Sequence, residues 1–332
     1  MKLRHTLPFI LVMTLAPAAA MACAACGCTL DTDEAATLDS NNPSSGFKLD
    51  ERFDYVNQNQ LMDGGKTNPS ADPTSQEVQK KTTTVFYTTT LDYTSQDPWG
   101  VSLAIPFQYR FHSSNNDMSN PSDNWMSKTR WTDQLGDIRL LGRYTGITAD
   151  REFPVMFGLK LPTGATNERF SSGNSTGANG GNVVTNTQLD RGLQPGTGTT
   201  DLLLGLGQGG TLSDKLTWFS QEMWQRPLDN VGGFRPGQII SASTGLRYAI
   251  NETFVPVLQV NAQNRWRDTG TSPATDRVNS GGELINLSPG LFVNVNEKLS
   301  VYTFVQVPVY QRVGGLELVP DYTASVGVKY KF

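Results

Sequence analysis

The sequence has 332 residues, including 32 glycines, and its 27 basic and 31 acidic side chains give a net charge of −4. This mildly acidic balance, with no cluster of basic residues, excludes a nucleic-acid-binding surface. With only two histidines in the chain, a His-based metal centre is not expected. Beyond the N-terminal region, no stretch approaches the roughly 20 apolar residues of a membrane-spanning helix.

Residues 1–22 have the features of a secretory signal peptide. Lys2 and Arg4 provide a basic start, residues 6–15 are mostly apolar, and Ala20-Met21-Ala22 resembles a cleavage site. The mature chain is therefore expected to begin at Cys23. Lipidation of Cys23 is an alternative, although Ala20 stands where a lipid-attachment signal normally has Leu.

Apolar and polar residues alternate with period two in about twelve segments, as in β-strands that have different surroundings on their two faces. In chain order, these segments lie near residues 47–60, 82–95, 99–111, 135–148, 153–162, 200–212, 215–226, 237–250, 253–266, 285–295, 299–312 and 322–332. Short connections near 96–98, 149–152, 213–214, 251–252 and 296–298 alternate with connections that include long polar stretches at 61–81, 112–134, 163–199 and 267–284. Short turns at one end and long loops at the other are typical of outer-membrane barrels.

The last segment alternates Tyr322, Val326, Val328 and Tyr330 with polar or small residues, and ends on Phe332. A soluble β-sandwich also alternates, but the export signal, the rhythm of the loops and the aromatic terminus favour a membrane barrel. We therefore predict an all-β fold: a transmembrane antiparallel barrel of about twelve strands over residues 47–332, preceded by a periplasmic tail at 23–46. It would lie in the lipid of the outer membrane with both termini in the periplasm.

Three short motifs resemble a known family. Leu135-Gly136-Asp137, Leu159-Lys160-Leu161-Pro162-Thr163-Gly164 and Leu193-Gln194-Pro195-Gly196-Thr197-Gly198, followed by Asp201, are similar to the outer-membrane proteins of the MetA-pathway-of-phenol-degradation family. The resemblance covers roughly residues 80–332. It implies a twelve-stranded barrel related in style to fatty-acid and aromatic-hydrocarbon transporters, and it carries over no catalytic or binding residue.

The N-terminal tail contains Cys23, Cys26 and Cys28, followed by a first strand that begins at Gly46-Phe47. This arrangement resembles barrels of metal-handling bacteria. Three close thiolates could bind a soft metal such as Cu(I), or Zn(II) with a fourth ligand, whereas an oxidising compartment favours a disulfide between two of them. Covalent haem attachment is excluded because Gly27 stands where His is needed.

Charged residues on the face opposite the lipid-facing set are the candidates for solute or ion selectivity, since charges in a narrow lumen control what passes. Structural pairing within the barrel is the alternative role. The candidates are Arg52, Arg110, Asp137, Arg139, Arg143, Lys160, Glu222, Arg247 and Arg265.

The long segment 163–199 is rich in Gly, Asn, Ser and Thr. We expect it to be a flexible external loop, with an inward fold that constricts the lumen as the alternative. No enzyme activity is expected, because His112 is the only histidine of the mature chain and neighbouring serines do not make a catalytic pair.

Two functions remain open at this point. The first is a channel for small solutes, including aromatic or hydrophobic compounds. The second is a barrel that docks a periplasmic electron-transfer or metal-handling partner through its Cys-rich N-terminus.

Overall fold

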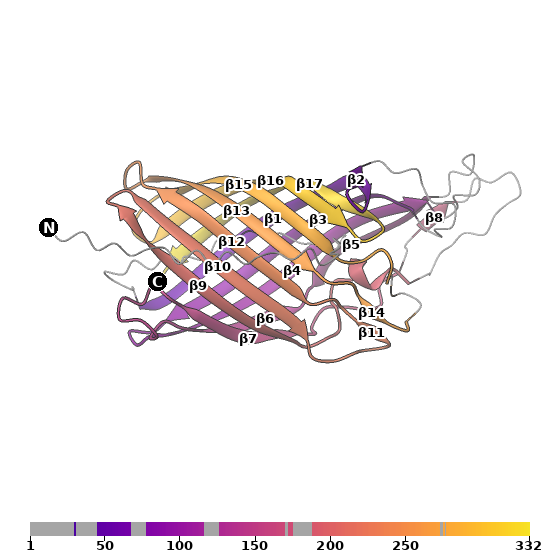
Figure 1. The fold of residues 1–332 in the computed structure, drawn as a ribbon, viewed down its shortest axis with the longest axis horizontal. Helices are drawn as coiled ribbons and strands as arrows, with labels where there is room; N and C mark the ends of the chain where they lie inside the picture. Colours follow the sequence, from indigo (N-terminus) through magenta and orange to yellow (C-terminus); the bar gives the residue numbers. More distant parts are fainter. Residues whose placement is uncertain are drawn as a thin grey trace, which may run out of the picture.

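Twelve antiparallel strands close into a barrel whose axis runs horizontally in Figure 1. The computed structural model describes residues 30, 45–67, 78–115, 126–169, 172–174, 188–272, 275 and 277–332. The expected signal peptide and the three cysteines lie outside these residues. Closure leaves no unpaired sheet edge along the wall, and this is what allows strands to cross a membrane.

The wall strands follow the predicted segments closely. They are β1 (Gly46–Asp63), β3 (Val78–Thr94), β4 (Trp99–Asn115), β5 (Met126–Leu135) continued by β6 (Ile138–Tyr144), β7 (Val155–Leu161), β9 (Asp201–Ser213), β10 (Leu216–Pro227), β12 (Ile239–Tyr248), β13 (Phe254–Arg265), β15 (Gly282–Asn294), β16 (Leu299–Val313) and β17 (Leu316–Lys331). The prediction of an all-β barrel of about twelve strands is confirmed.

The first and last strands close the barrel. β1 pairs with β17 from Lys48 opposite Lys331 to Asp63 opposite Leu316, and with β3 on its other side. The amide of Phe332 donates a hydrogen bond of 3.0 Å to the carbonyl of Phe47. The aromatic C-terminus is thus anchored to the start of β1.

One wall strand is interrupted. β5 and β6 both pair with β4, and the break between them falls at Gly136 and Asp137. The strands also extend beyond the predicted segments, because β4 and β5 remain paired up to Asn115 and Met126. Much of the stretch 112–134, which we expected to be a loop, is therefore part of this extended hairpin.

Smaller elements lie at the end with the long connections, on the right of Figure 1. They are β2 (Lys66–Thr67), β8 (Ser172–Asn174), the 3-10 turn η2 (Arg191–Leu193), and the pair β11 (Phe234–Arg235) and β14 (Thr269–Gly270). The short turns and the C-terminus lie at the opposite end. The predicted alternation of short and long connections agrees with this arrangement.

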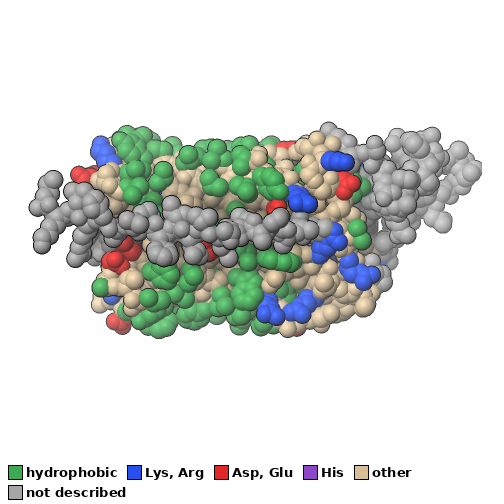
Figure 2. Space-filling view, viewed as in Figure 1, with side chains coloured by type: hydrophobic (Ala, Val, Ile, Leu, Met, Phe, Trp, Pro, Cys, Tyr) green, Lys and Arg blue, Asp and Glu red, His purple; other side chains and the backbone are tan. Residues whose placement is uncertain are grey.

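The outer face of the barrel is apolar. Phe53, Phe107, Leu204 and Val326 are among many large hydrophobic side chains that are exposed on the wall. Hydrophobic side chains dominate the middle of the face in Figure 2, and most charged side chains lie toward its two ends. Such a belt fits the hydrocarbon layer of a bilayer.

Aromatic side chains gather where the short turns begin. The ring centroids of Phe47 and Tyr93 are 4.9 Å apart, and those of Trp99 and Tyr144 are 4.6 Å apart. Aromatic rings prefer the membrane–water interface, so this end of the belt corresponds to an interfacial girdle. No helix among the described residues has the length and apolar character needed to cross a membrane.

Candidate functional site

The lumen contains a cavity of about 340 Å³ toward the middle of the barrel. Successive side chains of a strand point to opposite faces of the sheet. Phe53 and Phe107, which are adjacent in sequence to lining residues, are exposed on the outer face, so the lining residues point inward. Its polar and charged wall includes Arg52, Asp54, Arg110, Asp137, Arg139, Lys160 and Arg265. Six of the nine predicted lumen residues thus line one cavity.

Residues 188–199 of the connection from β7 to β9 fold into the lumen, and for these residues this corrects our expectation of an external loop. Gln108 Nε2 donates to the carbonyl of Pro195 at 2.6 Å, and Arg110 Nη1 donates to the carbonyl of Leu193 at 2.7 Å. Both donors belong to the inner face of β4. The segment 188–199, which we call the lumen loop, therefore narrows the barrel.

A buried ion network holds the lumen loop in place. Lys160 Nζ lies 2.9 Å from Asp137 Oδ2 and 3.2 Å from Asp201 Oδ2. Asp137 Oδ2 also accepts hydrogen bonds of 2.9 Å from the backbone N–H and the hydroxyl of Thr197, and the same hydroxyl contacts Lys160 Nζ. One lysine and two carboxylates thus connect three wall strands to the loop.

The three motifs that carry the family resemblance meet at this network. Asp137 Oδ1 accepts the backbone N–H of Gly164 at 3.1 Å, which joins the first motif to the second. A Cβ added to Gly164 would lie 2.6 Å from the Cα of Gly196, so the second and third motifs touch through their backbones. Only glycine permits this approach.

The sequence did not identify every residue of the site. Arg191 and Gln225 also line the cavity. Arg191 donates to the carbonyls of Thr166 at 3.3 Å and Thr197 at 2.7 Å, and its guanidinium lies 4.8 Å from the centre of the Phe234 ring. The signal that could have indicated the site is the pair of Gly-containing motifs at the two ends of the long connection, since their small residues allow close backbone packing.

Two predicted lumen residues lie on the inner face but outside the cavity. Arg143 lies 3.6 Å from Asp92 and donates to Thr94 at 2.9 Å, near the short turns. Arg247 lies over the rings of Phe219 and Phe292, at 4.9 and 5.7 Å from their centres. Both arginines are therefore held by other side chains of the barrel, which agrees with the alternative, structural role.

Glu222 is on the outer face of β10, and its prediction as a lumen residue is wrong. The register of β10 is regular from Thr217 to Pro227, and Gln225 lines the cavity, so Glu222 points the opposite way. Its partners across the sheet are Ala242 and the exposed Leu206. Nearby, Ser220 and Thr244 share a hydrogen bond of 2.9 Å between hydroxyls on an exposed surface, so the outer face here is mixed rather than apolar.

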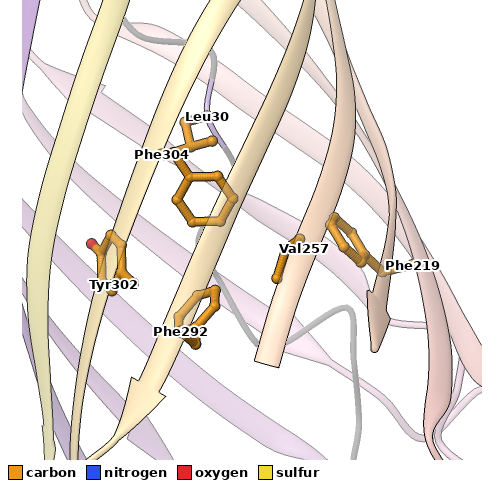
Figure 3. Close-up of a cluster of buried hydrophobic side chains, with 6 residues drawn as sticks. All are labelled: Leu30, Phe219, Val257, Phe292, Tyr302 and Phe304. Carbon is orange, nitrogen blue, oxygen red and sulfur yellow. The ribbon is translucent and has the colours of Figure 1, made fainter. Parts of the chain in front are cut away.

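An apolar cluster occupies another part of the lumen. It contains Phe219, Val257, Phe292, Tyr302 and Phe304 together with Leu30. Figure 3 shows Leu30 beside the ring of Phe304 within the barrel. Leu30 belongs to the segment predicted as a periplasmic tail, and at this residue the chain is buried among lumen side chains.

The remaining predictions are not tested by this part of the chain. The described residues contain no group of three or more His, Cys, Asp or Glu that could hold a metal ion, and Cys23, Cys26 and Cys28 lie outside them. His112 is buried within the barrel, where its Nδ1 is 2.8 Å from the hydroxyl of Thr82. The soft-metal and disulfide interpretations of the cysteines stay predictions.

No protein-family model matches the chain, and no curated protein matches it. Among solved structures, the chain is similar to the COG4313 outer membrane channel from Pseudomonas putida F1, with a TM-score of 0.61, 12% identity, and coverage of 88% of this chain and 97% of that chain. It is also similar to the Pseudomonas putida toluene transporter TodX, with a TM-score of 0.48, 9% identity, and coverage of 91% and 94%. A third is the β domain of the Bordetella autotransporter BrkA, with a TM-score of 0.47, 12% identity, and coverage of 87% and 100%.

The similarity to the COG4313 channel, at 12% identity, shows the fold of the chain, which is that of an outer-membrane β-barrel. It does not identify a solute.

Proposed function

We propose that this protein is an outer-membrane channel through which small solutes, including aromatic or hydrophobic compounds, cross the barrel lumen. The observation that carries the proposal is the cavity of about 340 Å³ between the wall and the inward-folded lumen loop. A loop that narrows a barrel in this way sets the size and charge of what can pass. The apolar belt of the wall supports the insertion of the barrel into a lipid bilayer.

The resemblance to the MetA-pathway-of-phenol-degradation family belongs to this proposal. Its three motifs form the anchor of the lumen loop through Asp137, Gly164 and Gly196. Residues that build such an anchor determine the width of the passage. We therefore infer that the motifs serve channel architecture rather than chemistry on a solute.

The orientation of the barrel in the membrane is also part of this proposal. Both termini would face the periplasm, because short turns lie on that side of outer-membrane barrels and longer loops lie outside. The C-terminus lies at the end with the short turns, which supports this orientation.

Liposome swelling tests the proposal. Purified protein in liposomes is compared with a variant that lacks residues 23–46, using a panel of sugars, amino acids, aromatic acids and neutral aromatic compounds. We expect permeation by at least one class of small solute, and faster permeation in the truncated variant, because Leu30 occupies part of the lumen. If neither protein admits any solute of the panel, the channel function is refuted.

A further inference from the structure

The cavity in the lumen is strongly basic. Six cationic side chains line it, against two carboxylates. They are Arg52, Arg110, Arg139, Lys160, Arg191 and Arg265, with Asp54 and Asp137. Two further carboxylates outside the lining form ion pairs with it, Asp201 with Lys160 and Asp268 with Arg265. Six cations and four carboxylates leave an excess of two positive charges. An excess of positive charge between low-dielectric walls raises the local concentration of anions.

The cations differ in how they are neutralised. Lys160 has two carboxylates within 3.2 Å, Arg265 lies 2.7 Å from Asp268, and Arg52 lies 2.9 Å from Asp54. These three have their counter-charges within the protein. Removing one partner of such a buried pair is destabilising, and the paired cations leave little charge for a solute.

Arg139 is held differently. Its Nη2 has a hydrogen bond of 3.5 Å to Gln225 Oε1, and within the described part of the chain it makes no ion pair. Gln225 is oriented by its amide nitrogen, which donates to Asp201 Oδ2 at 2.5 Å, so that its oxygen faces Arg139. A neutral amide thus contacts the guanidinium at the limit of hydrogen-bond distance, while the carboxylates of Asp201 and Asp137 attract it from farther away.

Arg191 adds a second cation of this kind from the lumen loop. The partners of its guanidinium are two backbone carbonyls and the face of the Phe234 ring. Its Nε is buried and has no hydrogen-bond partner. Guanidinium groups bind carboxylates in a planar, bidentate geometry, and both of these arginines face one cavity.

Apolar side chains form part of the remaining wall, beside threonines and glutamines. Phe86, Pro106, Phe234 and Ile239 line the same cavity. A volume of about 340 Å³ is at the lower end of the roughly 300–1,000 Å³ of small-molecule sites. An inorganic anion would leave these apolar side chains in contact with water.

We propose that this cavity binds a small organic monocarboxylate with an apolar body, whose carboxylate contacts Arg139 and whose body lies against Phe86 and Ile239. The proposal rests on the channel function and specifies its class of solute. Arg139 would act as the specificity residue, since it lines the cavity from the wall strand β6 and its guanidinium contacts a neutral amide, whereas the guanidinium of Arg110 is bound to the carbonyl of the lumen loop.

Calorimetric titration of the purified, detergent-solubilised protein tests the proposal. Benzoate is the probe, benzamide is its neutral counterpart of the same shape, and acetate is an anion without the apolar body. We expect benzoate to bind at least tenfold more tightly than either, a difference of about 1.4 kcal/mol. Equal affinity for benzoate and benzamide, or no binding of benzoate, overturns the proposal.

Two matched variants locate the site. Arg139→Gln removes the charge in the cavity, and Arg143→Gln removes the same charge from the same face of β6 outside the cavity. We expect a loss of roughly tenfold in benzoate affinity for the first and a change of less than about twofold for the second. Heat-modifiable migration in gel electrophoresis shows that each variant is folded. If folded Arg139→Gln binds benzoate as the wild type does, Arg139 is not the anchor.

Flux measurements separate this proposal from the channel function. Protein that binds benzoate but passes no solute in liposome swelling refutes the channel and leaves the anion site in place. Protein that passes benzamide and benzoate alike, and binds neither preferentially, refutes the anion site and leaves the channel in place.

Discussion

Gly164 and Gly196 touch backbone to backbone at the two ends of the connection between β7 and β9. A Cβ added to Gly196 would lie 2.5 Å from the carbonyl oxygen of Gly164 and 2.6 Å from Oδ1 of Asp137. Side-chain atoms do not approach backbone atoms this closely, so the contact requires glycine at position 196. It fixes the base of the lumen loop against the wall.

Gly196→Ala should displace the lumen loop from its anchor. Overpacking of this kind costs about 1–3 kcal/mol, and a shift of the loop relieves it. We expect single-channel conductance in planar bilayers to rise roughly twofold, because the loop narrows the passage. Gly65→Ala is the matched control, since a Cβ there meets no atom within 4 Å. Equal conductance of both variants would contradict a role of this contact in setting the width.

Asp137→Asn should loosen the same anchor electrostatically. The change removes one of the two carboxylates of Lys160 and weakens the bonds from Thr197. Because Lys160 keeps Asp201, we expect a loss of about 1–2 kcal/mol in stability, less than the roughly 3–5 kcal/mol for an ion left without a partner.

Urea unfolding in lipid vesicles measures this loss, and current noise from the open channel should increase with it. Asp97→Asn, in an exposed turn, is the control. A variant at position 137 as stable as this control would show that the network does not hold the loop.

Glu222 should face lipid and not the lumen. In a variant whose three native cysteines are replaced by serine, a nitroxide at position 222 is expected to collide with oxygen dissolved in the bilayer. A nitroxide at Gln221, on the opposite face of β10, should collide with a water-soluble nickel complex instead. Paramagnetic relaxation of the two nitroxides measures these collision rates. The reverse pattern would show that position 222 faces the lumen.

Glu222→Leu should stabilise the barrel without changing ion selectivity. A carboxylate within the lipid belt costs less than the roughly 2–4 kcal/mol of Arg or Lys, so we expect a gain of about 1 kcal/mol in urea unfolding. The reversal potential in a salt gradient should match that of the wild type. A shifted reversal potential would show that the carboxylate influences the passage.

Leu30→Asp should increase solute flux. Leu30 is buried beside Phe304 in the apolar cluster of the lumen (Figure 3), and an aspartate there would place a charge among aromatic rings, where burial is unfavourable. We expect the rate of liposome swelling to approach that of the variant lacking residues 23–46. If truncation increases flux and Leu30→Asp does not, the burial of Leu30 is not what limits solute flux.

Alternation of polarity predicted the inner face of most strands correctly. Arg52, Arg110 and Arg139 line the cavity as expected, because successive side chains of a strand point to opposite faces and the two faces differ in polarity. β10 is the exception. Its outer face contains Ser220 and Glu222 and its inner face contains Phe219, so polarity indicated the wrong phase and only the pairing with β9 and β12 decided it.

The lumen loop could not be predicted in the same way. Its segment has no periodic pattern, and its position depends on contacts with Gln108, Arg110 and Asp137, which are remote in the sequence. The family motifs on either side of it indicated a resemblance but not that they touch. Sequence spacing says nothing about which glycines meet across a barrel.

By itself, the sequence determined the barrel class, the number of wall strands, and the positions of short and long connections. Each of these follows from local periodicity and turn composition, which a strand shows regardless of its neighbours. Only the tertiary structure decided the inward fold of the lumen loop, the outer position of Glu222 and the different pairing of Lys160 and Arg139. These depend on which side chains closure of the sheet brings together, and that is a property of the whole barrel.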